Sequence, residues 1–113
     1  MNNIKLAIPL DGEELSEHFG HSREFAFYEI ESDKIVSSSR QIPPPHADGT
    51  IPRWLVENQV TDVLVGGIGP KAINILNDHK INVYVGVKTN LSENLASDFI
   101  KGSLQFGQNY CHH

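Results

Sequence analysis

Histidine side chains occur in this chain at positions where they could act as metal ligands. His18 and His21 lie three residues apart in a polar stretch, and His46 directly follows a run of three prolines. The sequence ends with a cysteine followed by two histidines. Imidazole and thiolate groups suit copper, zinc or iron, and an imidazole can also donate a hydrogen bond to sulfide. The candidate metal ligands are His18, His21, Cys111, His112 and His113.

Cys111 is the only cysteine of the sequence. One cysteine can neither form an internal disulfide nor supply the four thiolates of a conventional iron–sulfur site. A metal–sulfur cluster bound here must therefore bring its own sulfide or use other protein ligands.

Groups suited to a negatively charged ligand accompany the histidines. The turn Gly66–Gly69 allows a ligand to approach the backbone closely, and the helix expected from Pro70 would present free N–H groups beside it. Arg23 adds a planar cationic fork. The candidate cofactor-binding residues are His18, His21, Arg23, His46, Gly66, Gly67, Ile68 and Gly69.

Each of these residues also has a purely structural interpretation. His18 could brace its own loop, Arg23 could pair with Glu17 or Glu24, and the glycine turn could simply connect a strand to a helix. The terminal cysteine and histidines could bind metal without a function. These alternatives stay open at the level of the sequence.

The hydrophobic pattern predicts the elements that position these residues. Strands are expected at residues 5–10, 24–31, 34–42, 62–65 and 81–85. Helices are expected after Thr50 as a possible N-cap, from Pro70, and after Asn90, which could form a capping box with Glu93. Gly102 would end the third helix.

The resulting order is βββαβαβα, which predicts an α/β fold. Because βαβ crossovers favour parallel strands, the simplest assembly is a five-stranded mixed sheet in the order 3-2-1-4-5, with strand 2 antiparallel. This is a ribonuclease-H-like arrangement. Ligands of open α/β sheets bind beyond the carboxyl ends of the strands. His18, His21, His46 and the glycine turn follow strand ends on that edge, and Arg23 lies at the start of the second strand and faces the same region.

Composition limits the class of protein. The 113 residues suffice for one domain, expected at 1–102, with a flexible polar tail at 103–113. A net charge of −5 without a basic stripe argues against nucleic acid as a partner. No apolar run approaches the roughly 20 residues that span a membrane, and no signal peptide is recognisable. We therefore expect a cytoplasmic protein.

Three segments of the sequence carry distinctive motifs. They are Ser16–His21 with Phe25 and Tyr28, Pro44–His46 with Trp54-Leu55, and Asp62–Gly69 with Lys71-Ala72. Together they resemble the dinitrogenase iron–molybdenum cofactor biosynthesis family, which includes NifX and the carboxyl-terminal domain of NifB. The resemblance spans roughly residues 4–102. His21 and Lys71 stand where many relatives carry arginine.

The resemblance implies a ribonuclease-H-like fold and a non-catalytic carrier of a metal–sulfur cluster or its precursor. The cluster would be iron–sulfur, an iron–molybdenum precursor, or molybdenum–copper sulfide as in the orange protein. His18 is the best candidate ligand by this match. A cluster donor or acceptor protein is the implied partner.

Enzymatic alternatives have less support. Two-metal nuclease chemistry needs carboxylates converging on the sheet, but residues 6–8 of the first strand are Leu, Ala and Ile. A Cys111 nucleophile would lack an oriented base. The main alternative is a regulatory or adaptor protein that binds a phosphate-bearing small ligand at the glycine turn, although that turn lacks the Lys-Ser/Thr ending of a P-loop.

Overall fold

The computed structural model of the chain describes residues 3–45, 47 and 49–107. The strands are β1 (Asn3–Asp11), β2 (Glu14–Leu15), β3 (Glu24–Glu31), β4 (Lys34–Gln41), β5 (Asp62–Leu64) and β6 (Asn82–Tyr84). The helices are α1 (Thr50–Glu57), α2 (Pro70–Asp78) and α3 (Ser92–Lys101), and a single 3-10 turn spans Phe19–His21.

The strands form one mixed sheet, which confirms the predicted α/β class. Its order is β4-β3-β1-β5-β6, and β2 pairs with β1. β3 is antiparallel to β1 and to β4, whereas β5 is parallel to β1 and to β6. The carboxyl ends of β1, β4, β5 and β6 therefore lie together with the amino end of β3. We call this side of the sheet the carboxyl edge.

The short strand β2 was not expected, because the sequence pattern placed its residues in a loop. It folds back on β1 in a tight hairpin that pairs Leu10 with Leu15 and Asp11 with Glu14. Gly12 in the turn has a φ of 68°, which glycine adopts without strain. Two residues are too few to show alternation. The prediction of five strands is therefore wrong by one, and the ribonuclease-H-like class stays a prediction.

Two helix starts differ from the predictions. The N-cap of α1 is Gly49 rather than Thr50, and that of α3 is Leu91 rather than Asn90. Asn90 Oδ1 instead accepts hydrogen bonds from the Leu91 N–H at 2.8 Å and from Asn94 Nδ2 at 3.2 Å. The capping box is therefore wrong, because the Asn90 side chain is already occupied. Pro70 at the start of α2 and Gly102 after α3 are as predicted.

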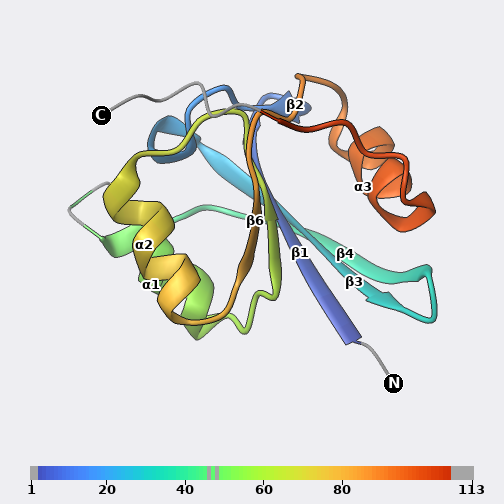
Figure 1. Cartoon of the computed structure of the whole chain (residues 1–113), viewed down its shortest axis with the longest axis horizontal. Helices are drawn as coiled ribbons and strands as arrows, with labels where there is room; N and C mark the ends of the chain where they lie inside the picture. The colour runs from blue at the N-terminus through green and yellow to red at the C-terminus, as the bar shows by residue number, and fades with distance from the viewer. Residues whose placement is uncertain (1–2, 46, 48, 108–113) are drawn as a thin grey trace.

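Helices cover both faces of the sheet, so the fold has three layers (Figure 1). α1 and α2 pack on one face around a core that includes Phe25, Leu55 and Val63. α3 packs on the other face around a core that includes Leu6, Ile8 and Leu95. Residues 103–107 continue from α3 toward β6, where Phe106 stacks edge-on against Tyr84. The domain boundary at residue 102 stays a prediction.

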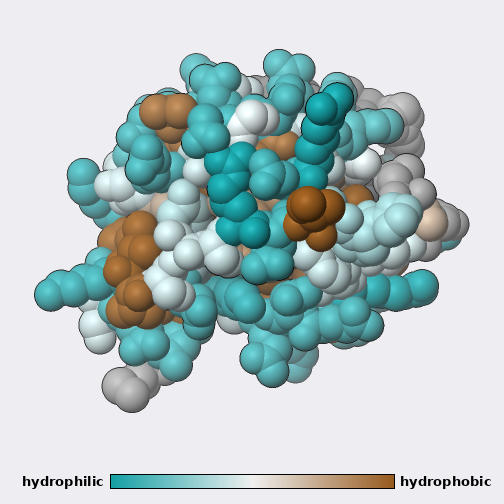
Figure 2. Space-filling view, turned by 180° about the vertical axis from the view of Figure 1, so that it is seen from behind, coloured by the Kyte–Doolittle hydropathy of each residue, from teal (hydrophilic) through white to brown (hydrophobic). Residues whose placement is uncertain are grey.

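The surface carries few large hydrophobic side chains. Figure 2 shows the side opposite to Figure 1, which is mostly hydrophilic with a few separate hydrophobic patches. Among the described residues the exposed large hydrophobics are Ile35, Val36, Ile42, Leu91 and Phe106. Within the described part of the chain, no helix has the length and apolar character needed to cross a membrane.

Candidate functional site

The loop between β2 and β3 carries two of the candidate histidines, and Ser16 fixes its start. The Ser16 N–H donates to the Pro9 carbonyl at 2.8 Å. The Ser16 hydroxyl lies 3.1 Å from the His18 carbonyl oxygen, to which it donates, and 3.3 Å from the His18 N–H. Ser16 is only 7% exposed. These short-range hydrogen bonds hold the backbone of His18 in one conformation.

Phe19 anchors the middle of the same loop in the core. Its side chain is 3% exposed and meets Phe25 edge-on, with the ring centres 5.7 Å apart. The Ser22 hydroxyl donates to the Phe19 carbonyl at 3.0 Å and closes the 3-10 turn. The loop is therefore fixed on its inner side, while the side chains of His18 and His21 are exposed on its outer side.

The histidine loop lies directly against the glycine turn. His18 and Gly67 form a parallel β-bridge. In this bridge the Gly67 N–H donates to the Glu17 carbonyl at 3.0 Å, and the Phe19 N–H donates to the Gly67 carbonyl at 3.1 Å. The sequence predicted only that both segments lie at the carboxyl edge, and the structure brings them into backbone contact.

The two imidazole rings lie close together. The ring centres of His18 and His21 are 6.1 Å apart, with the planes nearly perpendicular. Across residues 3–45, 47 and 49–107, no group of three or more His, Cys, Asp or Glu side chains is placed to hold a metal ion.

A cleft of about 230 Å³ opens at the carboxyl edge, between the 3-10 turn and the first turns of α1 and α2. Both helices have a glycine N-cap and no acidic residue in the first turn. Two helix dipoles therefore present their positive ends to one cleft, and the exposed Lys71 adds a cation. The lining residues are Phe19, Gly20, Ala47, Gly49, Ile51, Pro52, Lys71 and Ala72.

The members of the glycine turn have different surroundings. Gly66 and Gly67 are buried, and their backbone groups bond to Gly86 and to the histidine loop. Gly69 is half-buried at the N-cap of α2, and a Cβ built there meets no described atom within 4 Å. Gly66 and Gly67 thus support the loop, whereas Gly69 leaves space for a ligand.

The other predicted site residues are spread more widely. The side chain of Ile68 is 1% exposed and belongs to the core under α1 and α2, so only its backbone can face a ligand. Arg23 is exposed and directly precedes β3. The remaining candidates, His46, Cys111, His112 and His113, lie outside the described residues.

Sequence analysis missed the residues that hold the loop in place. Ser16, Phe19 and Ser22 were read only as part of a polar stretch or of a motif. A serine two residues before His18 is a signal for a local hydrogen bond from side chain to backbone, and from this signal the role of Ser16 could have been predicted. The burial of Phe19 depends on residues distant in the sequence and carried no local signal.

A profile of the family described as dinitrogenase iron–molybdenum cofactor matches residues 2–102. The chain belongs to this family. The match includes every described strand and helix, from β1 to α3. The family resemblance found in the sequence is thereby confirmed.

Other proteins are similar to the chain in sequence, in fold or in both. An uncharacterised protein of Methanocaldococcus jannaschii is 32% identical over 107 residues, which cover 90% of each sequence. The crystal structure of PH0822 has a TM-score of 0.85 and 30% identity, over 91% of this chain and 94% of that one. The apo form of the orange protein from Desulfovibrio gigas has a TM-score of 0.73 and 16% identity, covering 93% of each chain, which is a likeness of fold alone.

Proposed function

We propose that this protein is a non-catalytic carrier that binds a metal–sulfur cluster, or a precursor of one, at the carboxyl edge. The observation that carries the proposal is the bridge between His18 and Gly67. The bridge joins the loop that carries the two imidazoles to the glycine turn, and Phe19 and Gly20 of the same loop line the cleft. Membership of the family supports a role in cluster binding.

The chemistry of the site fits an anionic cluster as cargo. Iron–sulfur, iron–molybdenum precursor and molybdenum–copper sulfide clusters all carry sulfide and can be anionic. The two helix N-termini and Lys71 would offset negative charge, and His18 and His21 would ligate a metal or donate hydrogen bonds to sulfide. Arg23, His46 and the carboxyl-terminal Cys111, His112 and His113 remain further candidates for contact.

A carrier needs a protein that loads it and one that unloads it. We propose a cluster donor or acceptor protein as the partner, acting in the cytoplasm. An exposed site on fixed backbone suits such a transfer, because the imidazoles can be reached from solvent without unfolding of the loop.

Anaerobic reconstitution tests the proposal. The protein is loaded with iron and sulfide, or separately with tetrathiomolybdate and copper, and the metal retained after desalting is measured. We expect His18→Ala to weaken the retention of metal by about tenfold or more, because it removes the His18 imidazole as a direct contact to the cluster. His79→Ala is the matched control, because His79 is exposed and lies at the opposite end of α2 from the cleft.

Failure of the wild type to retain metal under either loading condition would exclude the carrier function for this protein. Equal retention by His18→Ala and His79→Ala would place the cluster elsewhere on the molecule.

One alternative has its own supporting observation. The convergence of two helix N-termini and Lys71 on one cleft also suits the phosphate of a small ligand, as an adaptor or regulatory protein would require. Calorimetric titration with ATP and with inorganic phosphate distinguishes the two functions. Binding of ATP that is insensitive to His18→Ala, together with no retained metal, would favour the adaptor.

A further inference from the structure

We propose that Arg40 is a positioning residue that closes the loop carrying His18 and His21. This inference rests on the proposed function, because it assigns Arg40 the task of holding the candidate ligands in place for the cluster. Arg40 itself lies on β4, away from the cleft.

Arg40 binds both ends of the histidine loop at once. Its Nη1 donates to Glu13 Oε2 at 2.6 Å, and its Nη2 donates to Glu24 Oε1 at 2.7 Å and to the Gly12 carbonyl at 2.8 Å. Glu13 directly precedes β2, and Glu24 is the first residue of β3. Every residue between these two carboxylates belongs to β2 or to the loop with His18 and His21.

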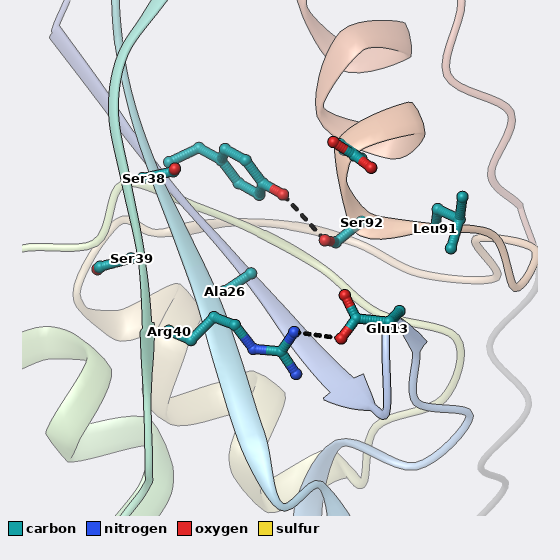
Figure 3. Close-up of a pocket in the computed structure, with 9 residues that line it drawn as sticks. Glu13, Ala26, Ser38, Ser39, Arg40, Leu91 and Ser92 are labelled. Carbon is teal, nitrogen blue, oxygen red and sulfur yellow. Dashed lines mark hydrogen bonds and ion pairs between the residues drawn. The ribbon is translucent and has the colours of Figure 1, made fainter.

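Figure 3 shows how the guanidinium lies in this arrangement. The Arg40 side chain extends from β4 across β3 toward Glu13, on the face of the sheet that α3 covers. It lies in a groove of about 300 Å³ between β4 and the start of α3. Arg40 thus spans from the edge strand to the hairpin that leads into the loop.

The first end of the loop is also tied to α3. The Ser92 N–H donates to the Glu13 carbonyl at 3.2 Å, and Glu14 forms an antiparallel bridge with Leu91. Ser92 in turn exchanges a hydrogen bond with the Tyr28 hydroxyl at 2.9 Å, which is drawn in Figure 3. The backbone of β1 joins the two ends, because Leu10 pairs with Leu15 of β2 and with Glu24 of β3. Arg40 adds a side-chain tie across these strands, from Glu13 to Glu24.

Charge makes Arg40 difficult to replace. The hydrogen bonds to Glu13 and Glu24 raise the pKa of the Arg40 guanidinium above its usual value, so it stays charged. Without it, two carboxylates of like charge would face each other across the loop ends. The Arg40 side chain is 37% exposed, and salt therefore screens these ion pairs.

Three variants separate the specific contacts of Arg40 from a general effect of charge. Arg40→Gln removes the cation. Arg40→Lys keeps the charge but not the planar fork that reaches two carboxylates, so it should have an intermediate effect. Lys34→Gln is the matched control, because it removes an exposed cation from the other end of the same strand.

Hydrogen–deuterium exchange of the apo protein measures the loop, and the half-life of the reconstituted cluster measures its consequence. We expect amides of residues 13–24 to exchange about three- to fivefold faster in Arg40→Gln, with α1 and α2 unchanged. The half-life of the reconstituted cluster should fall in Arg40→Gln and stay unchanged in Lys34→Gln. The difference in exchange should shrink in about 1 M salt, where the screening length is about 3 Å.

Exchange in Arg40→Gln that equals exchange in Lys34→Gln would overturn the inference. Faster exchange in Arg40→Gln with an unchanged half-life of the cluster would overturn the inference as well, because the contacts of Arg40 would then not affect the candidate ligands. If the wild type retains no cluster, the proposed function fails, and the exchange comparison still decides whether Arg40 holds the loop.

Discussion

Asp62 is a buried carboxylate whose oxygens accept hydrogen bonds from three side chains. Thr61 Oγ1 lies at 2.7 Å, and Asn82 Nδ2 and the Tyr84 hydroxyl each lie at 3.2 Å. Asp62 begins β5, so it is at the end of that strand opposite the carboxyl edge. A two-metal nuclease would need such a carboxylate to converge with others on the ligand. Asp62 instead joins β5 to β6.

The surroundings of Tyr84 give the stability of the protein a pH dependence. Burial, followed by the charge of Asp62 and their hydrogen bond, raises the pKa of the Tyr84 hydroxyl above its ordinary value of 10.0. Because the folded-state pKa is the higher one, the stabilisation is complete below the unfolded value and is lost as pH rises through the folded value. We expect the free energy of unfolding, measured by urea denaturation, to fall as the pH rises above about 10.

Tyr84→Phe should flatten this alkaline loss, although it should cost about 1 kcal/mol at neutral pH through the missing hydrogen bond. Tyr28→Phe is the control, because it removes a hydrogen bond of similar length to Ser92 and leaves Tyr84 in place. An equally steep alkaline loss in Tyr84→Phe and in the wild type would assign the pH dependence to another group.

At the scale of elements, α1 and α2 both have a glycine as N-cap, but the two glycines differ in conformation. Gly49 has a φ of 74°, and a Cβ there would approach Ile75 Cδ1 to 3.2 Å. Gly69 is extended with a φ of −73° and has open space around it. Only Gly49 therefore occupies a backbone conformation that disfavours other residues.

Alanine substitution should separate the two glycines. We expect Gly49→Ala to destabilise the protein by about 1–2 kcal/mol, because of its left-handed backbone and the close contact. Gly69→Ala should change stability by less than about 0.5 kcal/mol. If the cluster approaches the start of α2, Gly69→Ala should nevertheless shorten its retention. Thermal melts and the reconstitution assay measure the two effects, and a destabilised Gly69→Ala would contradict this account.

The sequence predicted the elements that contain a run or a face of apolar residues. β1 and β3 carry several apolar side chains within eight or nine residues, β5 belongs to a short apolar run, and the helices have an apolar face. β2 was missed because two residues carry no period. The starts of α1 and α3 were misplaced because the backbone path of the preceding loop, rather than the side-chain type of Thr50 or Asn90, decides where each helix begins.

The candidate site was predicted in outline because strand ends converge at one edge of a sheet. This rule placed the loop of His18 near the glycine turn. The same rule could not predict the direct bridge from His18 to Gly67 or the contacts of Arg40, because these depend on how the loop folds on itself. Arg40 meets its two carboxylates across 27 and 16 residues of sequence, a separation that no periodic pattern marks.

At the scale of the whole molecule, the sheet separates two cores. Ile51 belongs to the core under α1 and α2, and Ile30 to the core under α3. Ile51→Val and Ile30→Val should each reduce the free energy of unfolding by about 0.5–1.5 kcal/mol. Because the two side chains lie in different cores, the double variant should equal the sum within about 0.5 kcal/mol, as measured by urea denaturation. A larger discrepancy would mean that the two cores are coupled through the sheet.

The backbone bridge between His18 and Gly67 also limits how quickly and by what motion a bound cargo can be exchanged. Hydrogen bonds on either side of this bridge join the loop to the sheet, and Phe19 secures it from below. Rearrangement of the loop would have to break these contacts. Loading and release at this edge would then leave the backbone of the loop in place, and nuclear spin relaxation would show its amides as rigid as those of the neighbouring strands.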